Sequence, residues 1–316
     1  KIYEDAFAYS ILTNIEFSSD SELKIIEKDA FYGSQINSIS FPSKLEELKD
    51  GWCNRAELKK VTIDPNNKNF KIIDDNLFLG KSDNKSDVFD VLLFVNKKIE
   101  KIEIPSNIKI LGSYAFSYSQ IKELFIPSNI TEIRNGCFYD SQLESIEFSP
   151  DSQINSIESE LFSYCAIKEI TIPRNVKRIC TLSFVGCENL KSVNFTPDSN
   201  LQVIEKCAFK NSNIENLTLP SKLEKLEDGW CENMENVGNV TIMPNNKNFI
   251  KYEDKLILGK SDNKSDKFDV LLFALKDVEK VTIPSGIIKI ASYAFAKCKI
   301  NMISIPPSVK HICQSA

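Results

Sequence analysis

Residues 162–173 read FSYCAIKEITIP, and the rest of the chain is built from variants of this stretch. A Phe comes first, and a short segment that alternates apolar and polar residues follows it and ends at Pro. The alternation predicts a β-strand with one buried and one exposed face. Pro173 ends the strand because proline has no N–H to donate to a neighbouring strand.

The Phe of this stretch recurs along the sequence. Apolar residues stand five and eight positions before most copies, as Ile157 and Ile154 do before Phe162. Trp52 and Trp230 each follow a Phe by 21 residues, and we interpret them as occupying the Phe position of a shorter repeat. The recurring residues are Phe7, Phe31, Phe116, Phe138, Phe162, Phe184, Phe209 and Phe295.

One such unit is too short to bury its own apolar side, so stability requires that the units stack. Stacking aligns the Phe and Ile side chains into one core and pairs each strand with its copy one coil away. No helical period persists in the sequence. We therefore predict a single all-β-rich solenoid over residues 1–316, with parallel strands on its concave face, turns and short irregular coils on the convex side, and little helix.

The sequence also contains an internal duplication that is longer than the short repeat, because residues 27–118 match residues 205–297. Each copy holds an irregular stretch, at 64–98 and 243–277, where the Phe pattern lapses. In the first copy FKIIDDNLFLG, GKSDNKSD and DVLLF follow one another, which predicts a hairpin with a long polar turn. We expect both stretches to continue the stack as modified coils.

The two ends of the sequence fall inside repeats. Val309 and Ile312 occupy the apolar positions that precede a Phe, and Ile2 and Phe7 begin a repeat without its first half. Solenoids usually close with polar caps. We therefore expect this chain to be a fragment of a longer protein.

Composition argues against several classes of function. The net charge is −5, and Lys and Glu alternate without forming the basic stripe that a nucleic-acid binder needs. No apolar run approaches the roughly 20 residues of a membrane span, so this fragment is not expected to be membrane-inserted. The one His, His311, cannot supply the usual triads or zinc sites. We expect no enzymatic activity, no cofactor and no metal.

Three segments carry a resemblance to a known family. FSYCAIKEITIP at 162–173, FVGCENLKSVNFTP at 184–197 and FAKCKINMISIP at 295–306 each join Phe-x-x-Cys to an Ile-rich strand that ends at Pro. This pattern resembles the BspA-like leucine-rich-repeat family, and the resemblance covers essentially the whole chain. It implies a leucine-rich-repeat solenoid on a cell-surface or secreted protein of mucosal bacteria or protozoan parasites. Adhesion to host cells or extracellular matrix is the role it implies.

Nine cysteines and a repeated set of aspartates are the remaining candidates for chemistry. Every Cys has a fixed place in the repeat, and no C-x-x-C pair exists, which favours buried structural thiols. A disulfide between Cys165 and Cys187, one coil apart, stays an alternative. Asp83, Asp87 and Asp90 could gather around Ca²⁺, but a solvated turn fits their spacing better.

The exposed strand face is the predicted ligand face. Phe125 is the one large aromatic residue at its central positions, and charged residues surround it. An aromatic residue with charged neighbours is typical of interaction surfaces, although a single exposed apolar residue is also ordinary. The candidate ligand residues are Lys101, Glu103, Glu123, Phe125, Glu147 and Glu169. Among six N-x-Ser/Thr sequons, Asn84 and Asn129 are the first candidates for glycosylation.

These observations favour an interaction scaffold that binds a protein or extracellular-matrix ligand through its concave strand face. A glycan-binding surface protein is an alternative that would show aromatic platforms. A structural spacer without a ligand of its own is a third. Neither nucleic acid nor a cofactor is an expected partner.

Overall fold

The computed structural model describes residues 1–83, 85–234, 236–276 and 278–316. They form two compact units, one of residues 1–154 with 158–165 and one of residues 155–157 with 166–316. The regular structure of the described residues is all β, as the sequence predicted. No membrane-spanning helix occurs in this part of the chain.

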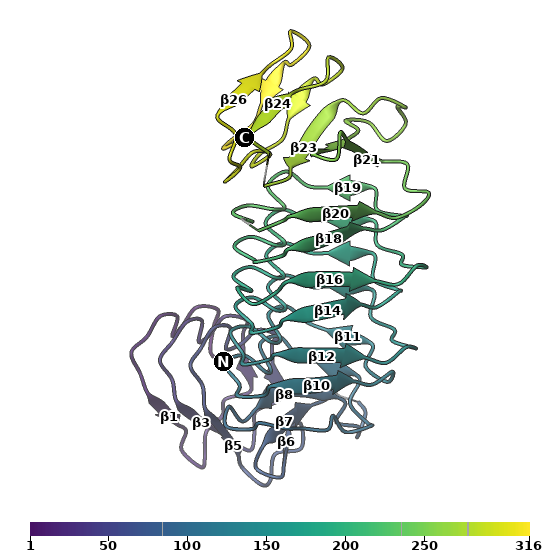
Figure 1. The fold of residues 1–316 in the computed structure, drawn as a ribbon. Helices are drawn as coiled ribbons and strands as arrows, with labels where there is room; N and C mark the ends of the chain where they lie inside the picture. Colours follow the sequence, from purple (N-terminus) through teal and green to yellow (C-terminus); the bar gives the residue numbers. More distant parts are fainter. Residues whose placement is uncertain (84, 235, 277) are drawn as a thin grey trace. The chain divides into compact units, whose positions relative to one another are not determined.

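The first unit holds twelve short strands (Figure 1). They are β1 (Asn14–Glu16), β2 (Ile25–Ile26), β3 (Ser38–Phe41), β4 (Glu47–Leu48), β5 (Lys60–Ile63), β6 (Lys71–Ile73), β7 (Leu77–Gly80), β8 (Val91–Val95), β9 (Ile110–Leu111), β10 (Glu123–Ile126), β11 (Glu132–Ile133) and β12 (Ser145–Phe148).

The second unit repeats this arrangement with fifteen strands. They are β13 (Ser156–Ile157), β14 (Glu169–Ile172), β15 (Arg178–Ile179), β16 (Ser192–Phe195), β17 (Val203–Ile204), β18 (Asn216–Leu219), β19 (Lys225–Leu226), β20 (Asn239–Ile242), β21 (Phe249–Tyr252), β22 (Leu256–Gly259), β23 (Val270–Ala274), β24 (Lys280–Thr282), β25 (Lys289–Ile290), β26 (Met302–Ser304) and β27 (His311–Ile312).

The longer strands pair in parallel, coil on coil, as the alternating pattern predicted. In the second unit β14, β16, β18 and β20 form one such ladder, and in the first unit β10 pairs with β12 (Figure 1). Leu124 and Ile146 are partners in the latter pair, and both are buried. Because side chains alternate along a strand, this register keeps one row of apolar residues in the core and the next row in solvent.

A second ladder lies where the sequence suggested irregular coil. The apolar residue five positions before each Phe after Phe7 sits in a two-residue strand, and these short strands pair in parallel, as β13, β15, β17 and β19 do. Ile157, Ile179 and Ile204 are partners in this ladder and are fully buried. Each regular coil therefore contributes one longer and one shorter strand.

The irregular stretch of each copy forms an antiparallel meander that rejoins the stack. β6, β7 and β8 pair antiparallel, and β8 then pairs in parallel with β9. β21, β22, β23 and β25 repeat this topology. The predicted hairpin with a long turn is β7 and β8, and it does continue the stack. The additional antiparallel strand β6 was not predicted.

The aligned Phe residues form the centre of the core. Phe31, Phe116, Phe138, Phe162, Phe184 and Phe209 are fully buried. Consecutive rings are in contact, with centroids 5.2 Å apart for Phe116 and Phe138 and 5.5 Å apart for Phe138 and Phe162. The prediction that stacking aligns the Phe residues in the core is confirmed for these six, whereas Phe7 and Phe295 are half-buried.

The assignment of Trp52 to the Phe position is wrong. The N–H of Phe138 donates to the residue before the next Phe, Leu161, whereas the N–H of Phe31 donates to Trp52 itself. Trp52 therefore precedes the Phe position, which Cys53 occupies. The indole still reaches the core and contacts Phe31, with centroids 5.9 Å apart. The large ring fills the space that a phenyl ring fills elsewhere.

Backbone conformation supports this correction. Two residues with positive φ flank the Phe position symmetrically in each turn, as Glu160 and Tyr164 flank Phe162. In the Trp repeat the corresponding residues are Gly51 and Arg55, which are symmetric about Cys53. Trp230 and Cys231 repeat this arrangement between Gly229 and Asn233. The Trp repeats are therefore not one residue shorter.

Candidate functional site

Phe125 lies on the exposed side of β10 with half of its side chain accessible (50%). Glu147 on β12 is its direct neighbour in the ladder, and Glu123 is the neighbour of Ser145. Parallel strands lie about 4.8 Å apart, so these four residues share one surface, which we call the Phe125 patch. Neither Glu123 nor Glu147 makes an ion pair with the described residues. The patch thus presents an apolar ring between two carboxylates.

The other three predicted ligand residues are not part of this patch. Lys101 and Glu103 are exposed, but no strand forms there, although the equivalent segment of the second copy is β24. Glu169 is exposed at the start of β14, in the second unit, beside Ser192 of β16. Alternation determines which side chains face the core, but strand formation also requires a partner in register.

The two glycosylation candidates stay predictions. Asn84 lies outside the described residues. Asn129 is half-buried, and its Nδ2 donates to the backbone carbonyl of Ile108 at 2.6 Å. A glycan on that nitrogen would have to replace this hydrogen bond.

All nine cysteines are free thiols, and seven of them are buried. Burial raises the pKa of Cys53 to about 12 and that of Cys165 to about 12. The thiol of Cys165 donates to the carbonyl of Phe138 at 2.9 Å. Since the thiolate is the reactive form, these residues are structural. The alternative of a bridge between Cys165 and Cys187 is wrong.

The aspartates of the polar turn do not form a metal site. Asp90 is buried and accepts hydrogen bonds from the N–H and Oγ of Ser82, at 2.8 and 2.7 Å. Asp83 accepts from the N–H of Lys85 at 2.9 Å. Asp87 is fully exposed. No group of acidic, His or Cys side chains among the described residues could hold a metal ion. The turn is solvated, as predicted, except at its anchor Asp90.

A row of tyrosines on the turns of the first unit was not predicted. Tyr9 contacts Tyr32, and Tyr139 contacts Tyr164, with centroids 5.3 and 5.6 Å apart. The guanidinium of Arg55 lies between the rings of Tyr32 and Tyr139, at 5.9 and 5.1 Å. The signal for this row was present, because Tyr recurs one or two positions after the repeated Phe.

Glu160 fixes the centre of this row. Its carboxylate accepts hydrogen bonds from Nη2 of Arg55 at 2.5 Å and from the hydroxyl of Tyr114 at 2.7 Å. Burial, together with this carboxylate, raises the pKa of Tyr114. The arrangement joins turns that are 105 residues apart in sequence. It is a structural clamp, which sequence spacing could not reveal.

Two equivalent clefts form where a meander meets the coil that precedes it. The first has a volume of about 480 Å³, and its lining includes Glu46, Leu48, Phe70, Lys81, Lys85 and Leu93. The second has a volume of about 580 Å³, and its lining includes the duplicates Glu224, Leu226, Phe249, Lys260, Lys264 and Leu272. We call them the first and second corner clefts. Both volumes lie within the range of small-molecule sites.

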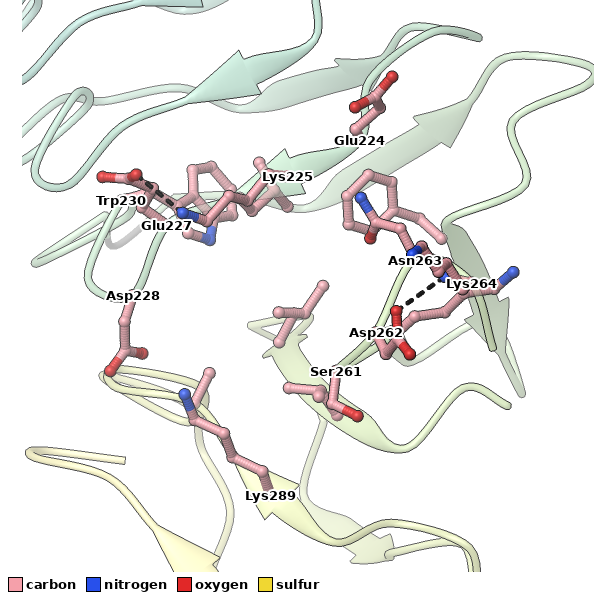
Figure 2. A pocket seen from close by; sticks show the side chains of 16 residues that line it. Glu224, Lys225, Glu227, Asp228, Trp230, Ser261, Asp262, Asn263, Lys264 and Lys289 are labelled. Atoms are coloured by element: carbon pink, nitrogen blue, oxygen red, sulfur yellow. Dashed lines mark hydrogen bonds and ion pairs between the residues drawn. The ribbon is translucent and has the colours of Figure 1, made fainter. Parts of the chain in front are cut away.

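Figure 2 shows how the second corner cleft is assembled. Glu224 and Lys225 come from the coil on one side, and Ser261, Asp262 and Asn263 come from the meander loop on the other. Asp228 holds the next coil in place, because it accepts hydrogen bonds from the N–H and Oγ of Ser292 at 2.8 and 2.9 Å.

The first corner cleft is held in the same way. Asp50 accepts hydrogen bonds from the N–H and Oγ of Ser113 at 3.2 and 2.6 Å. Asp50 and Ser113 are the duplicates of Asp228 and Ser292. The two clefts therefore have equivalent walls, and equivalent hydrogen bonds hold those walls in place.

Comparison with known proteins is consistent with this architecture. The sequence matches the BspA type leucine-rich-repeat region in six copies, over residues 1–90, 90–166, 155–253 and 266–316. The chain belongs to the BspA type leucine-rich-repeat family. No curated protein matches it significantly.

Two solved structures illustrate proteins whose fold is similar to that of this chain. The pneumococcal vaccine antigen PcpA is 21% identical, with a TM-score of 0.63 over 77% of this chain and 71% of that one. A leucine-rich-repeat protein from Eubacterium ventriosum is 21% identical, with a TM-score of 0.54 over 72% of this chain and 66% of that one. At this level of identity the likeness shows the fold alone.

Proposed function

We propose that this BspA type solenoid is an interaction scaffold that binds a protein ligand through the Phe125 patch. The observation that carries the proposal is the half-exposed ring of Phe125 between the carboxylates of Glu123 and Glu147. An exposed aromatic residue is costly to leave in water and gains most from an apolar pocket on a partner. The partner would present basic residues beside that pocket.

We place the protein at the cell surface or outside the cell, with a host-cell or extracellular-matrix protein as its ligand. The family supports this location, and one protein of similar fold is described as a vaccine antigen of pneumococcus. Leucine-rich-repeat solenoids are in general interaction scaffolds, which supports a binding role over a catalytic one.

The test compares binding of the chain and its variants to cultured epithelial cells and to immobilised matrix proteins. Phe125→Ala combined with Glu147→Lys should reduce binding at least tenfold, since it removes the ring and reverses one charge of the patch. Tyr164→Ala combined with Asp151→Lys is the matched control. Tyr164 is 49% exposed and Asp151 is exposed, and both lie on turns and not on the paired strands that carry the patch.

Equal binding by the wild type and the patch variant would overturn the proposal. A loss that the control shares would indicate that the effect is not specific to the patch and would also contradict it.

A further inference from the structure

We propose that the two corner clefts are equivalent binding sites for neutral oligosaccharides. The inference is independent of the Phe125 patch, because none of the patch residues lines either cleft. It rests on three features of the clefts: a loop that is identical in both copies, a balanced charge pattern and an apolar lining.

The loop at the rim is unchanged between the copies, and so is the largely buried FDVLLF segment that follows it at 89–94 and 268–273, whereas an exposed segment before the loop has diverged. LGKSDNKSD at 79–87 returns unaltered at 258–266. In the same meanders, KIIDDN at 71–76 has become IKYEDK at 250–255, with a single identical residue. Both segments are largely exposed. Exposure alone therefore does not explain which residues stayed the same.

Folding accounts for part of this preservation. Ser261 donates its N–H and Oγ to Asp269, as Ser82 does to Asp90. The ammonium of Lys260 lies 5.2 Å from the ring centre of Phe268, and that of Lys81 lies 5.0 Å from the ring centre of Phe89. These contacts explain the first lysine and the first serine of the loop, and the aspartate that follows the loop.

The second lysine has no such role. Lys85 and Lys264 line their clefts, and both are exposed. Neither side chain makes a hydrogen bond or an ion pair with the described residues. Lys68 and Lys247 are also identical and exposed, but only Lys85 and Lys264 line the clefts, and this position fits a role in binding a ligand.

The charges around the clefts favour a ligand that is itself uncharged. The first cleft is lined by four acidic and three basic residues, and the second by four of each. Carboxylates accept hydrogen bonds and ammonium groups donate them, so the rim can pair with hydroxyl groups in both senses. A strongly anionic or cationic ligand would meet as many like charges as opposite ones.

The apolar lining of each cleft completes a saccharide site. Leu226, Leu272 and the ring of Phe249 line the second cleft, and their duplicates Leu48, Leu93 and Phe70 line the first. Apolar side chains pack against the C–H face of a sugar ring while the rim binds its hydroxyl groups.

The experiment is titration calorimetry of the chain with neutral hexasaccharides of glucose, mannose, xylose and N-acetylglucosamine. We expect at least one of them to bind with a stoichiometry of two. Lys85→Ala or Lys264→Ala alone should abolish or weaken one site, and the double variant should weaken both at least fivefold. The control is Lys68→Ala with Lys247→Ala, a duplicated pair of exposed lysines on the same meanders that line neither cleft.

Several results would overturn the inference. They are an absence of binding by all four hexasaccharides, binding that the Lys85 and Lys264 variants leave unchanged, and tighter binding of heparin or hyaluronan than of any neutral sugar. Saccharide binding should persist in the Phe125→Ala, Glu147→Lys variant, so failure of this inference and failure of the proposed function are distinguishable.

Discussion

Lys97 is a buried cation in the core of the first unit. It is 8% exposed, and its ammonium lies 4.6 Å from the ring centre of Phe94 and 3.4 Å from Oγ of Ser117. Burial lowers the pKa of Lys97 to about 8. Because no carboxylate pairs with it among the described residues, its charge is a cost to the folded state.

Replacing Lys97 with Met should therefore stabilise the protein at pH 7, by about 2 kcal/mol. Below about pH 8 the lysine is charged in both states, and the penalty is complete. Between about pH 8 and its ordinary value of 10.5, the folded state has lost the proton while the unfolded state keeps it, so the penalty fades. Urea unfolding of the wild type and of the Lys97→Met variant from pH 6 to 10.5 measures the difference between their free energies of unfolding.

The duplicate of Lys97 provides the control. Lys276 is only half-buried and donates a hydrogen bond to Asn236 at 2.8 Å. Lys276→Met should change stability much less. A Lys97→Met variant that is destabilised, or whose gap to the wild type does not narrow as the pH rises, would contradict the assignment.

At the scale of elements, the meander turn depends on one side chain. Asp90 closes the long turn between β7 and β8 through its two hydrogen bonds from Ser82. Asp90→Ala would leave the N–H of Ser82 unpaired and should cost about 2 kcal/mol of folding free energy. Urea unfolding measures the loss.

Two further variants calibrate this prediction. Asp269→Ala removes the same pair of bonds from Ser261, but Asp269 is less buried, so its loss should be smaller. Asp87→Ala, at a fully exposed position of the same turn, should be close to neutral. An equal loss in all three variants would show that charge, and not the turn bonds, determines the stability of the meander.

At the scale of the whole molecule, each coil is expected to be stabilised mainly by the coils next to it. Phe138 is fully buried and contacts Phe116 and Phe162 on either side. Phe138→Ala should lower the free energy of unfolding by about 3 to 5 kcal/mol. Because a repeat contacts mainly its neighbours, hydrogen exchange should accelerate most in the coils around Phe116 and Phe162.

Phe125→Ala serves as the surface counterpart of that variant. The ring of Phe125 is half exposed, so the loss of folding free energy should stay below about 1 kcal/mol. Hydrogen exchange in the core should be unchanged. A uniform increase in exchange across the first unit after Phe138→Ala would contradict nearest-neighbour coupling.

The sequence by itself determined the solenoid, the duplication and the buried Phe row. These follow from periodicity, because a short repeat with one apolar face can be stable only by stacking on copies of itself. The fixed place of each Cys in the repeat explains why seven of the nine cysteines are buried. Phe125 could be identified as exposed because strand alternation determines which side chains face solvent.

Only the tertiary structure decided the rest. Cys53 takes the Phe position beside Trp52 because hydrogen bonds between coils set the register, and composition does not report register. The bond between Arg55 and Glu160 and the corner clefts join segments far apart in sequence. Periodicity describes what each coil repeats, whereas these features arise where the meanders interrupt the repeat and bring distant side chains together.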